Sequence, residues 1–336
     1  MSKTSPPKLP KGSGLPKLDA DGLLHLYREM ATIRRCEELA AKAYTLRKIL
    51  GFCHLYIGQE SVAVGAAAVC RTDDFWLAAY REHGHAMAKG VTARAMMAEL
   101  FGKATGCTSG LGGSMHLFDK SVNFLGGYGI VGGQVPLANG LGWAIKHSGD
   151  DRVCVCFFGE GAANQGAFFE AIALAQLYKL PVVFVCENNG YAMGTAVDRQ
   201  SAVTDMSTRA IGVGMARDSF EAFDVEVVRE RFGRAVKFAR AGKGPVFLEC
   251  VTYRFRGHSM SDPAKYRTKA ELEEKKKSDP LAITEDRLRD DFGVTDEQLK
   301  AIKDEIEVIA QDAYTFAEES PVPDPTTLYD HVYAGT

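Results

Sequence analysis

The chain has 336 residues, of which 46% are hydrophobic and 25% are charged, and its formal net charge is −3. This is the composition of an ordinary globular protein, and it shows no basic footprint for nucleic acid. No stretch reaches the roughly 18 consecutive apolar residues that a membrane helix needs. We therefore expect neither a nucleic-acid nor a membrane partner.

The first residues, up to about residue 20, are rich in Pro, Lys and Gly and lack the apolar segment of a secretory signal. They are also short and poor in arginine for an organelle transit peptide. We predict a mobile tail over residues 1–20, followed by a single domain over residues 21–336 that ends in a helical and tail extension. The eight cysteines form no CxxC pair, which argues against zinc and fits a reducing compartment. We expect the cytoplasm of a bacterium rather than the mitochondrial matrix.

Periodicity and turn residues predict alternating strands and helices. In chain order, the predicted elements are helices over 20–50, 58–70 and 90–103, an irregular Gly-rich segment over 106–133, a helix over 135–149, a strand over 152–158, a helix over 164–179, a strand over 181–186, a weak strand near 226–228, a helix over 229–242, a strand over 244–255, a loop with a charged helix over 257–280, and a helix over 295–320 that begins with a capping box. This alternation favours an α/β fold with a parallel sheet flanked by helices.

Polar residues follow two of these strands. Glu160 stands between two glycines directly after the 152–158 strand, and Asn188 and Asn189 follow the 181–186 strand. A right-handed crossover places both strand ends at the same edge of the sheet, where α/β folds bind ligands. Carboxylate, amide and carbonyl oxygens suit Mg²⁺ or Ca²⁺, and the helix N-terminus beside them suits a phosphate. The pattern predicts a metal-bridged diphosphate, with an ordinary strand–loop–helix turn as the alternative.

The stretch GEGAANQG…ENNGYAMGT resembles the thiamine-diphosphate motif, usually written GDG…NN. More closely, it resembles the E1 α subunits of 2-oxo acid dehydrogenases, and among these the pyruvate dehydrogenase branch. The resemblance extends from about Leu23 to Tyr333 and implies the transketolase-like diphosphate-binding fold. The motifs that support it are GFCHLYIGQE (51–60), AAYREHG (78–84), GGSMHLF (112–118), GGYGIVGGQVPLA (126–138) and YRFRGHSMSDPAKYR (253–267).

The resemblance implies roles for particular residues. Glu160, Asn189 and the Tyr191 carbonyl would hold Mg²⁺, although Asp is commoner than Glu at the first position. The residues expected to contact thiamine diphosphate are these three, Tyr80 and Arg81 beside the diphosphate, Gly161 and Ala162 through their backbone, Gly129 and Val131 on the aminopyrimidine side, and His54 and His258 near the diphosphate and the active-site mouth. His54 and His258 are also the predicted catalytic residues.

Other polar residues invite weaker hypotheses. His83 and His85 form an H-x-H pair that we do not interpret as a metal site, and we assign no role to His116. Ser259 matches the serine that is phosphorylated in mitochondrial relatives, but the lack of a clear transit peptide argues against such regulation here. We expect the loop over 257–268 to order over bound cofactor and to guide a lipoyl arm.

The implied activity is the oxidative decarboxylation of pyruvate, with transfer of the acetyl group to the lipoyl group of an E2 acyltransferase. An E1 β chain would complete an α2β2 heterotetramer and supply the glutamate that activates the cofactor, Glu60 being the candidate within this chain. Acetoin dehydrogenase and branched-chain E1 α subunits stay open as alternatives, as does a non-catalytic scaffold subunit. A nicotinamide-binding Rossmann enzyme is disfavoured because GEGAAN lacks the third glycine of GxGxxG.

Overall fold

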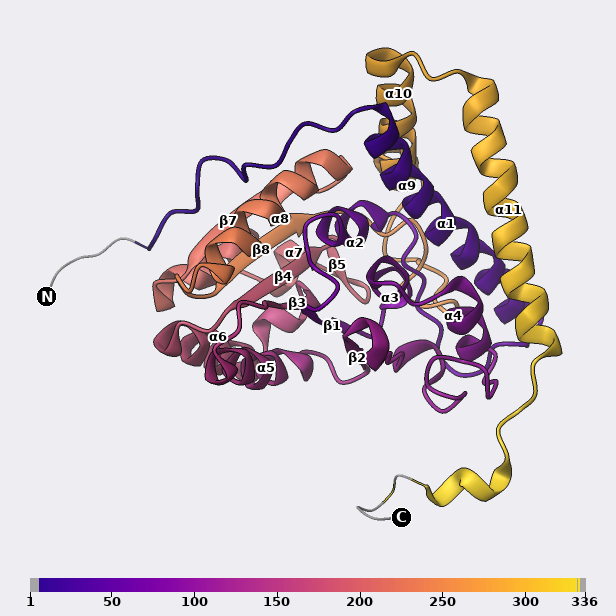
Figure 1. The fold of residues 1–336 in the computed structure, drawn as a ribbon, viewed down its shortest axis with the longest axis horizontal. Coiled ribbons are helices and arrows are strands. Elements are labelled where there is room, and N and C mark those ends of the chain that lie inside the picture. Colours follow the sequence, from indigo (N-terminus) through magenta and orange to yellow (C-terminus); the bar gives the residue numbers. More distant parts are fainter. Residues whose placement is uncertain (1–5, 331, 333–336) are drawn as a thin grey trace, which may run out of the picture.

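The computed structural model describes residues 6–330 and 332, and its centre is a six-stranded sheet in the order β2–β1–β3–β4–β8–β7 (Figure 1). Every neighbouring pair in this sheet is parallel, and helices cover it, which confirms the predicted fold class. Its strands are β1 (Phe75–Ala79), β2 (Phe124–Tyr128), β3 (Cys154–Gly159), β4 (Val182–Asn188), β7 (Ala216–Glu221) and β8 (Val246–Val251). A separate short hairpin pairs β5 (Tyr191–Ala192) with β6 (Thr195–Ala196).

The α-helices of the described chain surround this sheet. They are α1 (Ala20–Thr45), α2 (Glu60–Ala67), α3 (His83–Lys89), α4 (Ala93–Leu100), α5 (Gln134–Ser148), α6 (Gly166–Tyr178), α7 (Val197–Gln200), α8 (Val225–Arg240), α9 (Lys269–Lys276), α10 (Pro280–Phe292) and α11 (Asp296–Glu319). Within the described residues, none of these helices combines the length and the apolar character needed to cross a lipid bilayer.

The two faces of the sheet are covered by different helices because side chains alternate along each strand. Val155 and Phe157 of β3 belong to the core that includes α8, whereas Cys154, Cys156 and Phe158 belong to the core formed with α5 and α6. The cysteines of β3 are fully buried free thiols. The sheet is therefore shielded on both faces, and its strand ends are left for a site.

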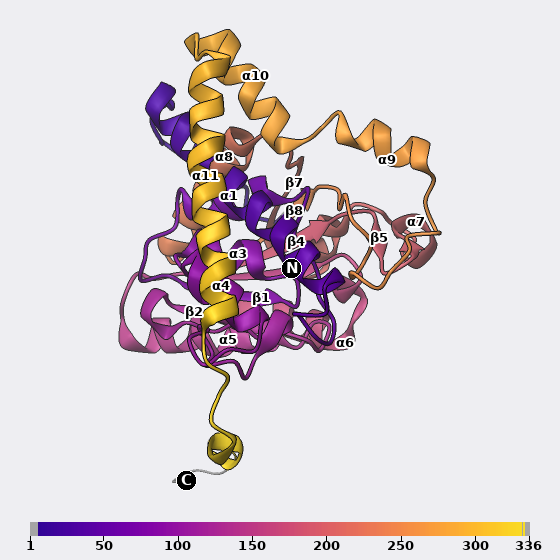
Figure 2. The same ribbon diagram turned by 90° about the vertical axis from the view of Figure 1, so that its right-hand side faces the viewer.

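Long helices at the ends of the chain form a further layer. α1 and α11 run side by side along one flank of the molecule (Figure 2). Thr295 and Gln298 form the predicted capping box at the start of α11, and the helix ends at its C-cap, Ser320. Beyond it, residues 321–330 extend away from the body, while residues 333–336 of the predicted tail lie outside the described part.

Two predicted elements were wrong. The expected weak strand near 226–228 lies within α8, and the strand is β7, ten residues upstream. Asp224 caps α8 by accepting a hydrogen bond from the Glu226 N–H, and Val225 and Val228 are buried one helical turn apart. The alternation of valines resembled a strand, whereas β7 was hard to find because an edge strand tolerates charged residues.

The Gly-rich segment over 106–133 is also more regular than predicted, because β2 forms an edge of the sheet beside β1. Its sequence FLGGY has few apolar anchors, yet Phe124 is fully buried. Gly126 has a φ of +112°, and a Cβ there would lie 2.0 Å from the Phe118 ring. Glycine is therefore required for the strand to pack closely, and the same glycines concealed it in the sequence.

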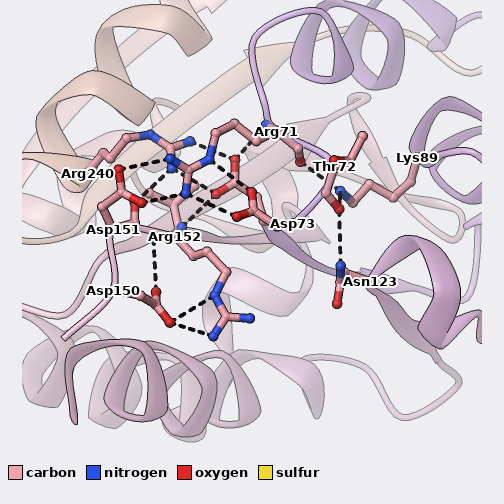
Figure 3. A network of polar contacts seen from close by, with 11 residues as sticks. Arg71, Thr72, Asp73, Lys89, Asn123, Asp150, Asp151, Arg152 and Arg240 are labelled. Atoms are coloured by element: carbon pink, nitrogen blue, oxygen red, sulfur yellow. Dashed lines mark hydrogen bonds and ion pairs between the residues drawn. The ribbon is translucent and has the colours of Figure 1, made fainter. Parts of the chain in front are cut away.

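Two sets of polar contacts organise the molecule away from the carboxyl edge of the sheet. Residues 6–19 lie along α8, where Arg234 donates to the Pro10 carbonyl and Lys237 to that of Ser13. The mobility of the tail stays a prediction, and residues 1–5 lie outside the described part. At the amino ends of β1 and β3, Arg71 pairs with Asp151, and Arg240 of α8 donates to the Asp151 carbonyl (Figure 3).

Candidate active site

Glu160 and Asn189 lie next to each other at the carboxyl edge of the sheet. β3 and β4 pair in parallel, with Gly159 opposite Glu187, so the residues that follow them emerge together. The Asn189 N–H points to Oε2 of Glu160 at 3.4 Å, and both side chains are buried. The α6 crossover thus brings together two residues that are 29 positions apart in the sequence, as expected.

Two adjoining cavities open at this edge. The first, of about 280 Å³, is named here the Glu160 cavity, and the second, of about 570 Å³, the His54 cavity. Predicted site residues that line the Glu160 cavity are Tyr80, Arg81, Val131, Glu160, Gly161, Ala162, Asn189, Tyr191 and His258. Those that line the His54 cavity are His54, Tyr80, Gly129, Val131 and His258. Every predicted cofactor-binding residue therefore borders one cavity or both.

The predicted metal ligands form a set of hard oxygen donors. Oε1 of Glu160 is buried without a hydrogen-bond partner, although the residue is only 1% exposed. Asn189 Oδ1 and the Tyr191 carbonyl oxygen converge on one cationic group, because each accepts from Nη1 of Arg254 at 3.0 Å. Among the described residues, no group of three or more His, Cys, Asp or Glu side chains is arranged for a metal. The mixed donor set fits a hard divalent cation.

The positive charges of the Glu160 cavity are held by backbone oxygens. Arg81 donates to the carbonyls of Leu55 and His258, at 2.8 Å each. Burial, and then the neighbouring Arg254, lowers the pKa of Arg81 to about 10, which leaves it charged at neutral pH. A buried charge that has no carboxylate partner in its hydrogen bonds is suited to an anionic ligand.

Glu160 and Gly161 connect this chemistry to the helix that follows. Burial raises the pKa of Glu160, with Arg254 among the groups that oppose the rise. A Cβ at Gly161 would lie 2.8 Å from the Cβ of Ala192, so glycine allows the hairpin to approach closely. A 3₁₀ turn over Ala162–Asn164 leads into α6, whose N-terminus faces the same edge. This arrangement suits a phosphate group.

Three rings gather where the two cavities meet. The His54 ring centroid lies 4.6 Å from that of Tyr80 and 5.1 Å from that of His258. Burial, followed by the charge of Arg81, lowers the pKa of His54 to about 2 and that of His258 to about 4. Nδ1 of each imidazole is buried without a partner. Both rings are therefore neutral at pH 7 and have hydrogen-bonding capacity to spare.

The sequence did not single out several residues that border the Glu160 cavity. Arg254 is almost fully buried and bridges Asn189 and Tyr191, and Gln59 accepts from Asn189 Nδ2 at 3.1 Å. Arg254 and Gln59 lie inside the 253–267 and 51–60 motifs, so their polar side chains could have been predicted as site residues from the sequence. Glu187 directly precedes the two asparagines and accepts a hydrogen bond from Tyr56.

His83, His85 and His116 contact different groups. Nδ1 of His83 contacts Glu37 at 3.0 Å, whereas Nε2 of His85 contacts Glu187 at 3.2 Å. Nδ1 of His116 contacts the Gly127 carbonyl oxygen at 3.1 Å.

Two other candidates from the sequence lie in different surroundings. Glu60 is fully buried and borders neither cavity. Both of its carboxylate oxygens are paired with Arg34, at 2.5 and 3.0 Å. It is therefore unsuited to the role considered for it. Ser259 is buried, lines the His54 cavity and shares a hydrogen bond with Ser261.

Known proteins are similar in sequence to this chain over most of its length. A family model described as "Dehydrogenase E1 component" matches residues 28–326. The chain belongs to the dehydrogenase E1 component family. Among curated family members, it is 46% identical to the pyruvate dehydrogenase E1 component subunit alpha of Rhizobium meliloti over 322 residues, which cover 96% of this chain and 92% of the relative.

Further E1 relatives come from distant organisms. The chain is 46% identical to the E1 subunit alpha of Zymomonas mobilis, with 97% of this chain and 93% of the relative covered. It is 45% identical to the human somatic, mitochondrial E1 subunit alpha, with 94% and 80% covered. These names are those of pyruvate dehydrogenase subunits, and they confirm the family resemblance found in the sequence.

Proposed function

We propose that this chain is the α subunit of a pyruvate dehydrogenase E1 component, which decarboxylates pyruvate and passes the acetyl group to the lipoyl group of an E2 acyltransferase. One observation carries the proposal: a buried Glu160 carboxylate with an unpartnered oxygen shares a cavity with Asn189, the Tyr191 carbonyl and a buried Arg81. Pyruvate as the substrate is supported by the names of the relatives.

In this proposal the Glu160 cavity holds Mg²⁺ and thiamine diphosphate. Glu160, Asn189 and Tyr191 would bind the metal through their oxygens, and Arg81 would donate to the diphosphate. Thiamine diphosphate supplies the electron sink that allows a 2-oxo acid to lose carbon dioxide. Gly161 and Ala162 would approach the diphosphate through the backbone, with Tyr80 beside it.

The His54 cavity would receive the substrate. Gly129 and Val131 border it from the loop before α5 and would contact the aminopyrimidine side of the cofactor. His54 and His258 stay neutral because they are buried beside Arg81, so they can donate and accept hydrogen bonds without carrying charge. We propose that these two imidazoles orient the carboxylate and carbonyl groups of the substrate.

A β subunit would cover the outer side of α5 and α6, two helices that pack against each other. We call this side the α5–α6 face. Its large exposed apolar side chains are Leu137, Trp143, Phe169, Leu174, Leu177 and Tyr178, with exposed fractions between 42% and 70%. Several exposed apolar side chains on two adjacent helices are typical of protein interfaces. Val131, which borders both cavities, is exposed just before α5, so a partner seated here would reach the cavity mouth.

The partners follow from this arrangement. The β chain of an α2β2 heterotetramer would supply the glutamate that Glu60 cannot provide, since Glu60 is paired with Arg34 and borders neither cavity. A lipoyl domain of E2 would approach the 257–268 loop, which lines the His54 cavity through His258, Ser259 and Asp262. We place the complex in the bacterial cytoplasm.

The first experiment is a calorimetric titration of the co-expressed αβ complex with thiamine diphosphate and Mg²⁺. Wild type should bind tightly, and Glu160→Ala should weaken binding about 100-fold or more, because it removes the charged metal ligand. Glu305→Ala, exposed on α11 away from the α5–α6 face, is the matched control and should bind like wild type. Equal affinity of wild type and Glu160→Ala would refute the metal role.

The same samples discriminate the remaining candidates. Turnover with pyruvate, branched-chain 2-oxo acids and acetoin separates the three enzyme families, and pyruvate should give the highest kcat/KM. A scaffold subunit would assemble with its partner but bind no cofactor in any form.

A further inference from the structure

Gln200, the last residue of α7, is a cavity residue for which the sequence gave no signal. Its side chain lines the Glu160 cavity together with Glu160 and Gly161. Its Nε2 is buried and has no hydrogen-bond partner among the described residues. Its Oε1 lies 3.6 Å from the position that a Cβ on Gly161 would occupy. The amide group therefore lies against the glycine at which the phosphate is expected.

Hydrogen bonds between neighbouring residues fix the chain segment that carries Gln200. Arg209 donates to the Ala163 carbonyl at 3.0 Å and to Asn164 Oδ1 at 2.6 Å, and it also donates to the Ser201 hydroxyl at 3.1 Å. Asn164 Nδ2 in turn donates to Ser201 Oγ at 3.2 Å. These bonds tie the turn before α6 to the end of α7. Gln200 is thus fixed next to the N-terminus of α6 by residues that do not border the cavity.

A buried donor without a partner is uncommon in folded proteins and is costly to maintain. Three other lining residues of this cavity also have a buried polar atom without a partner: Oε1 of Glu160, Nε of Arg254 and Nδ1 of His258. Glu160 Oε1 is an acceptor suited to a cation, whereas Gln200 Nε2, like Arg254 Nε, is a donor suited to an anion. Glu160 and Gln200 both border the cavity beside Gly161. A metal diphosphate presents both kinds of partner at once.

We propose that Gln200 binds the diphosphate by donating a hydrogen bond from Nε2 to a phosphate oxygen on the Gly161 side. The proposal deepens the proposed function and rests on it for the identity of the cofactor. The Gln200 amide would orient the diphosphate through a directional hydrogen bond without adding charge. The metal and Arg81 would balance the negative charge of the diphosphate. Gln200 is in this sense a positioning residue for the cofactor, separate from the metal ligands.

The test measures the affinity of the αβ complex for two probes, Mg²⁺–thiamine diphosphate and Mg²⁺–pyrophosphate. Gln200→Ala and Gln200→Met, which keeps the length of the side chain, should both raise the Kd for each probe by about 5- to 20-fold, the usual effect of one lost hydrogen bond. Gln200→Glu should raise it by about 100-fold or more, because a carboxylate would face the phosphate. Arg199→Ala, exposed on α7, is the matched control.

The outcomes are distinct. Unchanged affinity of the alanine and methionine variants for both probes overturns the Gln200 contact while leaving the proposed function intact. A wild type that binds pyrophosphate in a Gln200-dependent way, but not thiamine diphosphate, keeps the phosphate contact and refutes the cofactor. Light scattering and circular dichroism identify a variant that fails to assemble, and the other neutral variant then decides the question.

Discussion

The charge state of the two active-site imidazoles is set by their surroundings. His54 and His258 lie in a buried cluster beside Arg81, and both the loss of hydration and the positive neighbour disfavour the protonated ring. Arg81 itself is held by two carbonyls and cannot move away without breaking both bonds. One buried guanidinium would therefore bind the proposed anionic cofactor, and it also helps to keep the neighbouring imidazoles neutral.

This leads to a pH prediction. An ordinary imidazole, as in the unfolded chain, has a pKa near 6.5, whereas His258 in the fold has a pKa of about 4. Between these values the unfolded chain binds more protons, so the free energy of unfolding should fall as the pH is lowered through this window. Replacing Arg81 by methionine should raise the pKa of His258 and so narrow the pH range over which the free energy of unfolding falls.

NMR titration of histidine-labelled protein provides the measurement, with His54→Asn and His258→Asn variants assigning the signals. In wild type neither ring should protonate above about pH 5. Arg71→Met, at the opposite edge of the sheet, is the control and should leave both signals unchanged. A His258 midpoint that stays the same in Arg81→Met would show that burial alone sets it.

At the scale of elements, one carboxylate organises the Gly-rich segment before β2. Glu99 of α4 is fully buried and accepts four backbone hydrogen bonds, from Thr108 and Gly110 at 2.9 Å each, from Gly112 at 2.8 Å and from Gly113 at 3.0 Å. The segment has little apolar surface of its own. Its shape therefore depends on α4, and it carries Met115 to the wall of the His54 cavity.

Glu99→Ala should destabilise the chain by about 3–5 kcal/mol, because four half-buried N–H groups lose their acceptor. Glu99→Gln keeps one acceptor oxygen, so the free energy of unfolding should decrease by about half as much as in Glu99→Ala. Urea denaturation gives the stability, and hydrogen exchange should show faster exchange confined to residues 106–115. Glu305→Ala, which removes an exposed ion pair with Arg28, should change neither quantity measurably. Unaltered exchange over 106–115 in Glu99→Ala would contradict this account.

At the scale of the whole molecule, the site and the α5–α6 face belong together. The cavities open at the end of the sheet from which α5 and α6 begin, and the outer side of both helices carries large exposed apolar side chains. Exposed apolar side chains gathered in this way often mark an interface, so we expect a partner chain to cover this face.

Charged substitutions on the α5–α6 face should separate assembly from folding. Trp143→Glu and Leu177→Glu change side chains that are 49% and 70% exposed, so the isolated chain should keep its stability. The dissociation constant of the αβ complex should rise about 100-fold or more, as for an interface hot spot. Val308→Glu, 69% exposed on α11, is the matched control. Sedimentation that shows an intact complex in all three variants would place the partner elsewhere.

Much of this could be predicted from the sequence because the information is local. Apolar runs of strand length separated by helical periodicity determine a parallel α/β sheet, and the handedness of the crossover then places Glu160 beside Asn189. The capping box of α11 involves residues only three positions apart. β1, β2 and β7 were missed. β2 and β7 are edge strands, which are short of apolar residues, so their sequences do not identify them as strands. β1 lies inside the sheet but is only the five-residue run FWLAA, so it gives a weak periodic signal.

The tertiary structure decided which polar groups are already paired. Arg34 of α1 neutralises Glu60, Arg254 bridges Asn189 and Tyr191, and Gln200 is left with an unpartnered donor. Each depends on segments far apart in the chain that meet only when the core packs, and no periodicity or spacing encodes them. By itself the sequence determined the fold class and the residues that meet at the sheet edge. Which side chains remain free for a ligand, and which helical face stays uncovered, follow from packing alone.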